Sequence, residues 1–175
     1  MDFIAKVLPS LHARLSQKSK FNGAPTALFV TGAALRVVDV TRVLKDKKLR
    51  GDKGGEVAKL FAKHFKLEEH VKYLKRTKVG AAVGTPGRIG KLLCETGETI
   101  LLFSLSLHPI PCAFDLDALS LSALTHIILD VTFRDAKNRT LLDLPETRDE
   151  VFKTVLGGSR VKEAIKQGKL HVVLF

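Results

Sequence analysis

The stretch V-G-A-A-V-G-T-P-G-R-I-G-K-L-L, residues 79–93, decides the fold of this chain. Residues 79–83 are small and apolar, which predicts a buried strand, and Gly84 then allows the backbone to turn. Thr85 is suited to cap a helix, and Pro86 is suited to its first turn because that position needs no amide hydrogen bond. Apolar residues spaced three and four apart follow, so the stretch predicts a strand, a sharp turn and a helix.

Arg88 lies in the first turn of that predicted helix. The amides there are exposed, and the positive end of the helix dipole favours a negatively charged ligand such as a phosphate. An incidental arginine on a plain strand-to-helix connection is the alternative. The motif alone does not decide between them, because short motifs occur by chance.

The positive charge of the chain is concentrated around this turn. Residues 42–91 contain 15 Lys and Arg against 5 Asp and Glu, an excess of 10, whereas the whole chain has a net charge of +11. A solvated lysine face explains any single basic helix. An excess gathered beside the T-P-G-R turn favours a polyanionic partner.

Composition predicts one globular domain spanning residues 1–175, because 45% of the residues are hydrophobic and the length suffices for a core. No apolar run approaches the roughly 20 residues of a membrane span, and residues 1–8 lack the pattern of a signal peptide. Aromatic residues make up only 6% of the chain, which argues against base stacking as the main binding mode. We interpret Cys94 and Cys112 as structural thiols of an intracellular protein.

Apolar strand-like runs alternate with helical patterns along the chain, which predicts an α/β fold with a mostly parallel central sheet flanked by helices. The expected strands are Ala27–Thr31, Val79–Val83, Thr99–Leu107, Thr125–Val131 and Leu170–Phe175. The expected helices are Phe3–Leu15 with a kink at Pro9, Ala33–Leu44, Val57–Leu74, Asp117–Ala123, Pro145–Leu156 and Ser159–Gln167. Residues 45–55 are expected to form a basic, glycine-rich loop, and His64 is interpreted as a core histidine rather than a ligand.

A parallel sheet places its ligand site at the carboxyl ends of its strands, where Thr31, Thr85 and Asp130 are expected. Neither the phosphate-binding string G-x-x-x-x-G-K-[ST] nor G-x-G-x-x-G occurs in the sequence. Asp130 is placed as a magnesium ligand would be, but a capping or salt-bridged aspartate is the alternative. We therefore expect no catalytic residue, no metal and no cofactor.

The arrangement resembles the first RecA-like domain of DEAD-box RNA helicases. The carrying segments are A-K-V-L-P-S-L, A-L-F-V-T-G-A-A-L-R, V-G-T-P-G-R-I, I-I-L-D-V-T-F and L-H-V-V-L-F. This resemblance implies a P-loop NTPase-like fold, here without its phosphate-binding loop. D-V-T-F replaces D-E-A-D, so the catalytic glutamate is missing and Asp130 would mark a vestigial nucleotide cleft.

A more extensive resemblance is to the Cms-one ribosomal small-subunit family, degenerate helicase-like proteins of the small-subunit processome. It rests on K-L-F-A-K-H-F-K-L-E-E-H-V-K-Y-L, V-G-T-P-G-R-I-G-K-L-L and D-V-T-F-R-D-A-K-N-R. The resemblance implies a nucleolar, non-catalytic assembly factor of the 90S pre-ribosome. Its partners would be pre-ribosomal RNA, neighbouring assembly proteins or both, with no membrane and no small-molecule substrate.

The helicase resemblance implies RNA-backbone contacts at a set of residues around the turn. The resemblance gives this role to Thr85, Gly87 and Arg88, and we expect Lys91 and, as the nearest basic residue of a second motif, Arg36 to join them. Basic residues nearby are expected to extend the surface: Lys45, Lys47, Lys48, Arg50, Lys59, Lys63 and Lys66. Two alternatives remain: an ATP-dependent helicase whose phosphate loop lies upstream of Met1, and a scaffold that binds only proteins.

Overall fold

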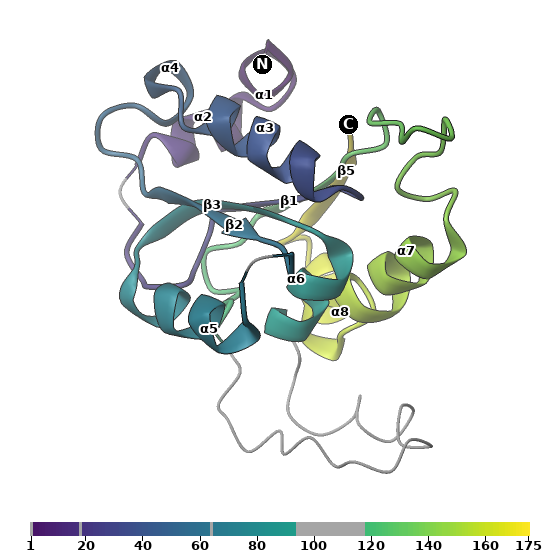
Figure 1. The fold of residues 1–175 in the computed structure, drawn as a ribbon. Helices are drawn as coiled ribbons and strands as arrows, with labels where there is room; N and C mark the ends of the chain where they lie inside the picture. Colours follow the sequence, from purple (N-terminus) through teal and green to yellow (C-terminus); the bar gives the residue numbers. More distant parts are fainter. Residues whose placement is uncertain (1, 18, 64, 94–117) are drawn as a thin grey trace.

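The computed structural model describes residues 2–17, 19–63, 65–93 and 118–175. Its centre is a sheet of five parallel strands in this part of the chain (Figure 1). The strands are β1 (Ala27–Val30), β2 (Glu56–Leu60), β3 (Val79–Gly84), β4 (His126–Leu129) and β5 (His171–Leu174), in the order β2-β3-β1-β4-β5. The structure confirms the predicted α/β class and is consistent with a RecA-like fold.

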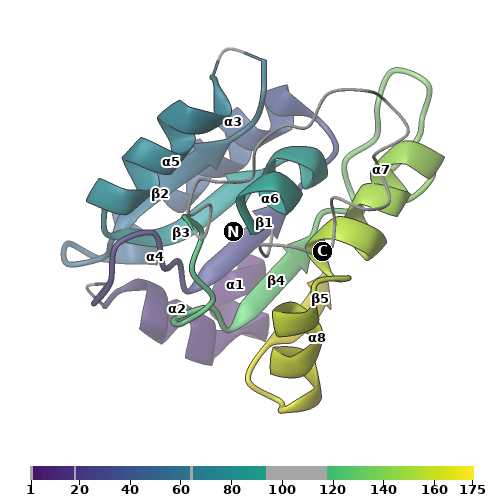
Figure 2. The ribbon, with the colours of Figure 1, turned by 90° about the horizontal axis from the view of Figure 1, so that it is seen from below.

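Helices cover both faces of the sheet, as Figures 1 and 2 show from two sides. One face carries α1 (Asp2–Val7), α2 (Pro9–Leu15), α3 (Ala34–Leu44) and the short α4 (Lys47–Arg50). The other carries α5 (Leu67–Arg76), α6 (Pro86–Leu93), α7 (Pro145–Asp149), the π-helical η1 (Glu150–Val155) and α8 (Ser159–Lys166). No helix among the described residues is long and apolar enough to cross a membrane.

Alternation along each strand divides the core into two halves, because successive strand side chains point to opposite faces. Leu28 and Val30 of β1 pack with α5, α6, η1 and α8. Ala27 and Phe29 of the same strand pack with α1, α2 and α3. Every residue of β1, β3 and β4 is buried, as expected for a parallel sheet covered on both faces.

The prediction of one helix over Val57–Leu74 is wrong in its first half. Residues 56–60 form strand β2, which pairs in parallel with β3, and the helix α5 begins only at Leu67. The amide of Lys66 donates to the Glu69 carboxylate (2.9 Å) and fixes that start. The buried residues of this strand and of the segment after it are spaced as they would be on a helix, which explains the wrong prediction. Residues 56–60 form a strand because they pair with β3.

Smaller differences concern segment boundaries. Pro9 is the first residue of α2, so the predicted Phe3–Leu15 helix is two helices that meet at Leu8. Helix α4 lies within the predicted loop of residues 45–55. Residues 118–123 form turns and bends where a short helix was expected. The strand predicted at 99–107, both cysteines and His64 lie outside the described residues.

Candidate nucleic-acid interface

All five strands end at the same edge of the sheet, which we call the carboxyl edge. The turn at Thr85 lies there and matches the prediction: strand β3 ends at Gly84 and α6 starts at Pro86. The Thr85 amide donates to the Leu60 carbonyl (3.0 Å), and the Thr85 carbonyl accepts from the amides of Arg88 (3.1 Å) and Ile89 (3.0 Å). Thr85 therefore joins the end of β2 to the first turn of α6.

The first turn of α6 also packs against η1, at Gly87. A Cβ atom on this residue would lie 2.6 Å from a carboxylate oxygen of Glu150, so the side chain of η1 rests against the glycine. A carboxylate beside the start of a helix is stabilised by the helix dipole. The first turn of α6 thus already has a negatively charged neighbour from within the protein.

Arg88 was expected to be available to a ligand, but its side chain is buried. Only 8% of the residue is exposed. Its guanidinium contacts His70 Nδ1 (Nη1, 3.2 Å) and donates from Nη2 to the Phe65 carbonyl (2.8 Å). Arg88 therefore ties the first turn of α6 to His70 in α5 and to Phe65, which precedes that helix.

The contact with Arg88 fixes the protonation state of His70. An arginine nitrogen only donates, so Nδ1 of His70 must accept and the ring must be neutral, with its proton on Nε2. Burial, and second the charge of Arg88, lower the pKa of His70 from 6.5 to about 4. A charged guanidinium is thus paired with a neutral imidazole and a backbone carbonyl.

Arg36 and Asp130, predicted to serve two different sites, form one ion pair. Arg36 Nε donates to Asp130 Oδ2 (2.8 Å), and the Asp130 side chain is fully buried. Its other oxygen accepts from the amide (3.2 Å) and hydroxyl (2.8 Å) of Thr132 and from the amide of Phe133 (3.3 Å). The Arg36 guanidinium also lies 5.8 Å above the Phe133 ring. Both oxygens of Asp130 are therefore engaged by the protein, which fits the capping and salt-bridged alternative.

The predicted basic surface is divided between two edges of the sheet. Lys63 and Lys66 are exposed on the loop that follows β2, so they lie at the carboxyl edge. Lys45, Lys47, Lys48 and Arg50 precede β2 and lie at the opposite edge. Exposed Lys59 lies within edge strand β2, and exposed Lys91 lies on α6. Strand β2 therefore divides the basic run of the sequence into two groups, one at each end of the strand.

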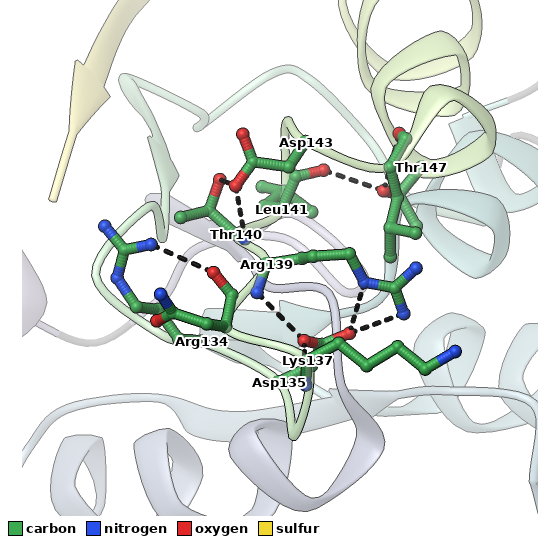
Figure 3. A network of polar contacts seen from close by, with 10 residues as sticks. Arg134, Asp135, Lys137, Arg139, Thr140, Leu141, Asp143 and Thr147 are labelled. Atoms are coloured by element: carbon green, nitrogen blue, oxygen red, sulfur yellow. Dashed lines mark hydrogen bonds and ion pairs between the residues drawn. The ribbon is translucent and has the colours of Figure 1, made fainter.

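A turn after β4 adds a structured basic segment, residues 134–139. Asp135 accepts from the amides of Lys137 (2.8 Å) and Arg139 (2.9 Å) and from the Arg139 guanidinium (2.9 and 2.7 Å; Figure 3). The Arg139 side chain is the main cause that lowers the pKa of Asp135 to about 2. Arg134 closes the turn by donating to the Asn138 carbonyl (3.0 Å).

The described residues contain no group of three or more His, Cys, Asp or Glu side chains that could hold a metal ion. The sequence had no signal for the two pairings that organise this edge. Arg36 and Asp130 are 94 residues apart, and Arg88 and His70 are 18 apart in different helices. For the turn after β4, a local signal was present in the sequence: Asp135 and Asn138 are residue types that favour turns.

His70 makes the stability of the fold depend on pH. Its pKa is about 4 when folded and 6.5 in the unfolded chain, so the unfolded state binds more protons between these values. The free energy of unfolding should therefore decrease as the pH falls from about 6.5 to about 4. We expect the free energy of unfolding, measured with urea, to fall less between about pH 7 and about pH 5 in His70→Gln than in the wild type. An unchanged difference would contradict this role.

The Arg36–Asp130 pair should contribute to stability because its removal leaves a buried carboxylate without its cation. We expect Arg36→Leu to lower the free energy of unfolding by about 3 kcal/mol. Arg42→Leu on the same helix is the matched control: Arg42 is 76% exposed, 3.6 Å from Asp39, and should cost no more than about 0.5 kcal/mol. Equal losses in chemical denaturation would contradict the assignment.

Known proteins resemble this chain over most of its length. The sequence model of a family described as "CMS1: U3-containing 90S pre-ribosomal complex subunit" matches residues 1–107 and 112–175. Protein CMS1 of Chaetomium thermophilum is 37% identical over 161 residues, which cover 92% of this chain and 54% of that protein. Protein CMSS1 of Danio rerio is 30% identical over 173 residues, which cover 99% of this chain and 50% of that protein.

Protein cms1 of Schizosaccharomyces pombe is 37% identical over 142 residues, which cover 77% of this chain and 42% of that protein. The chain thus spans about half the length of the curated relatives it matches. The family match confirms the resemblance drawn from the K-L-F-A-K-H-F and T-P-G-R-I segments. The chain belongs to the CMS1 family, described as a subunit of a U3-containing 90S pre-ribosomal complex.

Proposed function

We propose that this chain is a non-catalytic, helicase-like part of a 90S pre-ribosomal assembly factor that works in the nucleolus. The family description supports the complex, and the binding partner we propose is pre-ribosomal RNA. The contact surface would be the carboxyl edge around α6. Its members are Thr85, Gly87, Lys91, Lys63 and Lys66.

The observation that carries this proposal is the buried Arg88 guanidinium. It holds the Phe65 carbonyl (2.8 Å) and so fixes the loop that carries Lys63 and Lys66 beside the first turn of α6. Two exposed cations then lie on the segment beside the first turn of α6, and both favour a phosphate. Arg88 would support RNA binding by positioning this loop, while Lys63 and Lys66 would contact the phosphates of the RNA.

A nucleotide-driven mechanism has less support at this edge. Asp130, the residue that a magnesium ion would need, is fully buried and shares its oxygens among Arg36, Thr132 and Phe133. A metal would have to displace these donors. Asp130 and Arg36 would instead stabilise the end of β4.

Contacts between Lys63 or Lys66 and RNA phosphates would fix the position of the RNA and would not select a base sequence.

Charge reversal at the two edges tests which of them contacts RNA. Each Lys→Glu changes the charge by two, so Lys63→Glu/Lys66→Glu and Lys47→Glu/Lys48→Glu both lower the net charge from +11 to +7. We expect the first pair to lower affinity for single-stranded RNA at least about tenfold. The plot of log K against log salt should also become less steep, by about 1.4, because two phosphate contacts are lost.

The second pair is the matched control and should leave affinity within about threefold of the wild type. Fluorescence anisotropy over a salt series would measure both effects. Equal losses in the two variants would mean that net charge alone attracts RNA. A larger loss from Lys47 and Lys48 would place the contact at the opposite edge, and either result would contradict the proposal.

A further inference from the structure

Phe65 is an exposed aromatic residue in the middle of the proposed RNA surface. It lies between the exposed Lys63 and Lys66, on the loop that joins β2 to α5, and 39% of the residue is exposed. Its backbone carbonyl is the acceptor for Arg88 (2.8 Å). The backbone at Phe65 is therefore held by the first turn of α6.

Ring contacts also fix the position of the side chain. The Phe65 ring lies 5.6 Å from Phe61 in an edge-on arrangement (81°) and 5.3 Å from the His70 ring, tilted by 32°. Phe61 and His70 are themselves only 7% and 4% exposed. One part of the ring is thus anchored on buried neighbours while another part stays open to solvent. A pre-positioned, partly open aromatic ring loses little conformational freedom when a flat ligand stacks on it.

The charges around the ring favour a nucleic acid as that ligand. Proteins that bind single strands combine cations that follow the phosphates with aromatic rings on which the bases stack. Lys63 and Lys66 supply the cations directly beside Phe65, and Lys91 is exposed on the neighbouring helix. Bases within a duplex are already stacked on each other, so only an unpaired base has a free face for this ring.

We propose that Phe65 stacks on an unpaired base of an RNA strand whose phosphates contact Lys63 and Lys66. This inference rests on the proposed function and adds to it that the bound RNA is single-stranded at this point. Stacking on one phenylalanine accepts any base, so it contributes affinity without reading a sequence.

Substitution of Phe65 tests the stacking contact. Phe65→Ala should lower affinity for a short single-stranded RNA about five- to 150-fold and leave any affinity for duplex RNA unchanged. Phe152→Ala is the matched control, because Phe152 is 52% exposed on η1 and should leave both affinities unchanged. Phe65→Leu keeps an apolar side chain of similar bulk and should lose nearly as much affinity as the alanine variant. Thermal unfolding would confirm that all three variants are folded.

A direct readout is available because the chain contains no tryptophan. Phe65→Trp would therefore carry the only indole, whose fluorescence should be quenched by single-stranded RNA. It should not be quenched by an abasic oligonucleotide of equal length and charge. Wild-type affinity in Phe65→Ala, or equal quenching by both oligonucleotides, would overturn the stacking proposal.

The same experiment separates the two proposals. RNA binding that depends on Lys63 and Lys66 but not on Phe65 would overturn only the stacking contact. Failure of the wild-type protein to bind either single-stranded or duplex RNA would overturn the proposed function, and the stacking contact with it.

Discussion

The carboxyl edge of this protein depends on one buried guanidinium. Arg88 sits in the first turn of α6, where its charge must be satisfied away from water. The Phe65 carbonyl and the His70 imidazole provide the acceptors, from two segments that precede the T-P-G-R turn in the chain. A buried cation without these partners would be strongly unfavourable, so the loop after β2, the start of α5 and the start of α6 are held together.

A second buried charge organises the neighbouring part of the edge. Asp130 at the end of β4 is saturated by Arg36 from α3 and by the backbone and hydroxyl groups that follow it. The ion pair ties α3 to the carboxyl end of β4. The carboxylate is therefore satisfied within the protein, while Lys63 and Lys66 on the segment after β2 are exposed, which is consistent with the proposed contact to RNA.

Much of the fold could be predicted from local sequence. The runs at residues 27–31, 79–83 and 125–131 are short, apolar and bounded by turns, and each forms a buried parallel strand. The T-P-G-R turn was equally readable because Thr85 and Pro86 have strong positional preferences at a helix start. Strand β2 was missed because its apolar residues and those of the next loop also fit a helical period.

The site was less predictable because it depends on long-range pairing. Residue types identified Arg88 and Asp130 as candidates, but their burial and their partners follow from how the sheet brings distant segments together. Likewise, a run of lysines in the sequence gives no sign that strand β2 separates it into two edges. The proposed distinction between residues that contact phosphate and a residue that positions them therefore rests on the burial and the partners of Arg88.

The affinity of Arg88→Lys for single-stranded RNA tests this distinction most directly. Lysine keeps the charge but lacks the forked geometry that reaches two acceptors at once. If Arg88 positions the loop, the variant should bind RNA about tenfold more weakly than the wild type, because the loop with Lys63 and Lys66 is no longer fixed. If Arg88 contacts phosphate itself, lysine should replace it with a change of no more than about twofold, and that result would contradict the account.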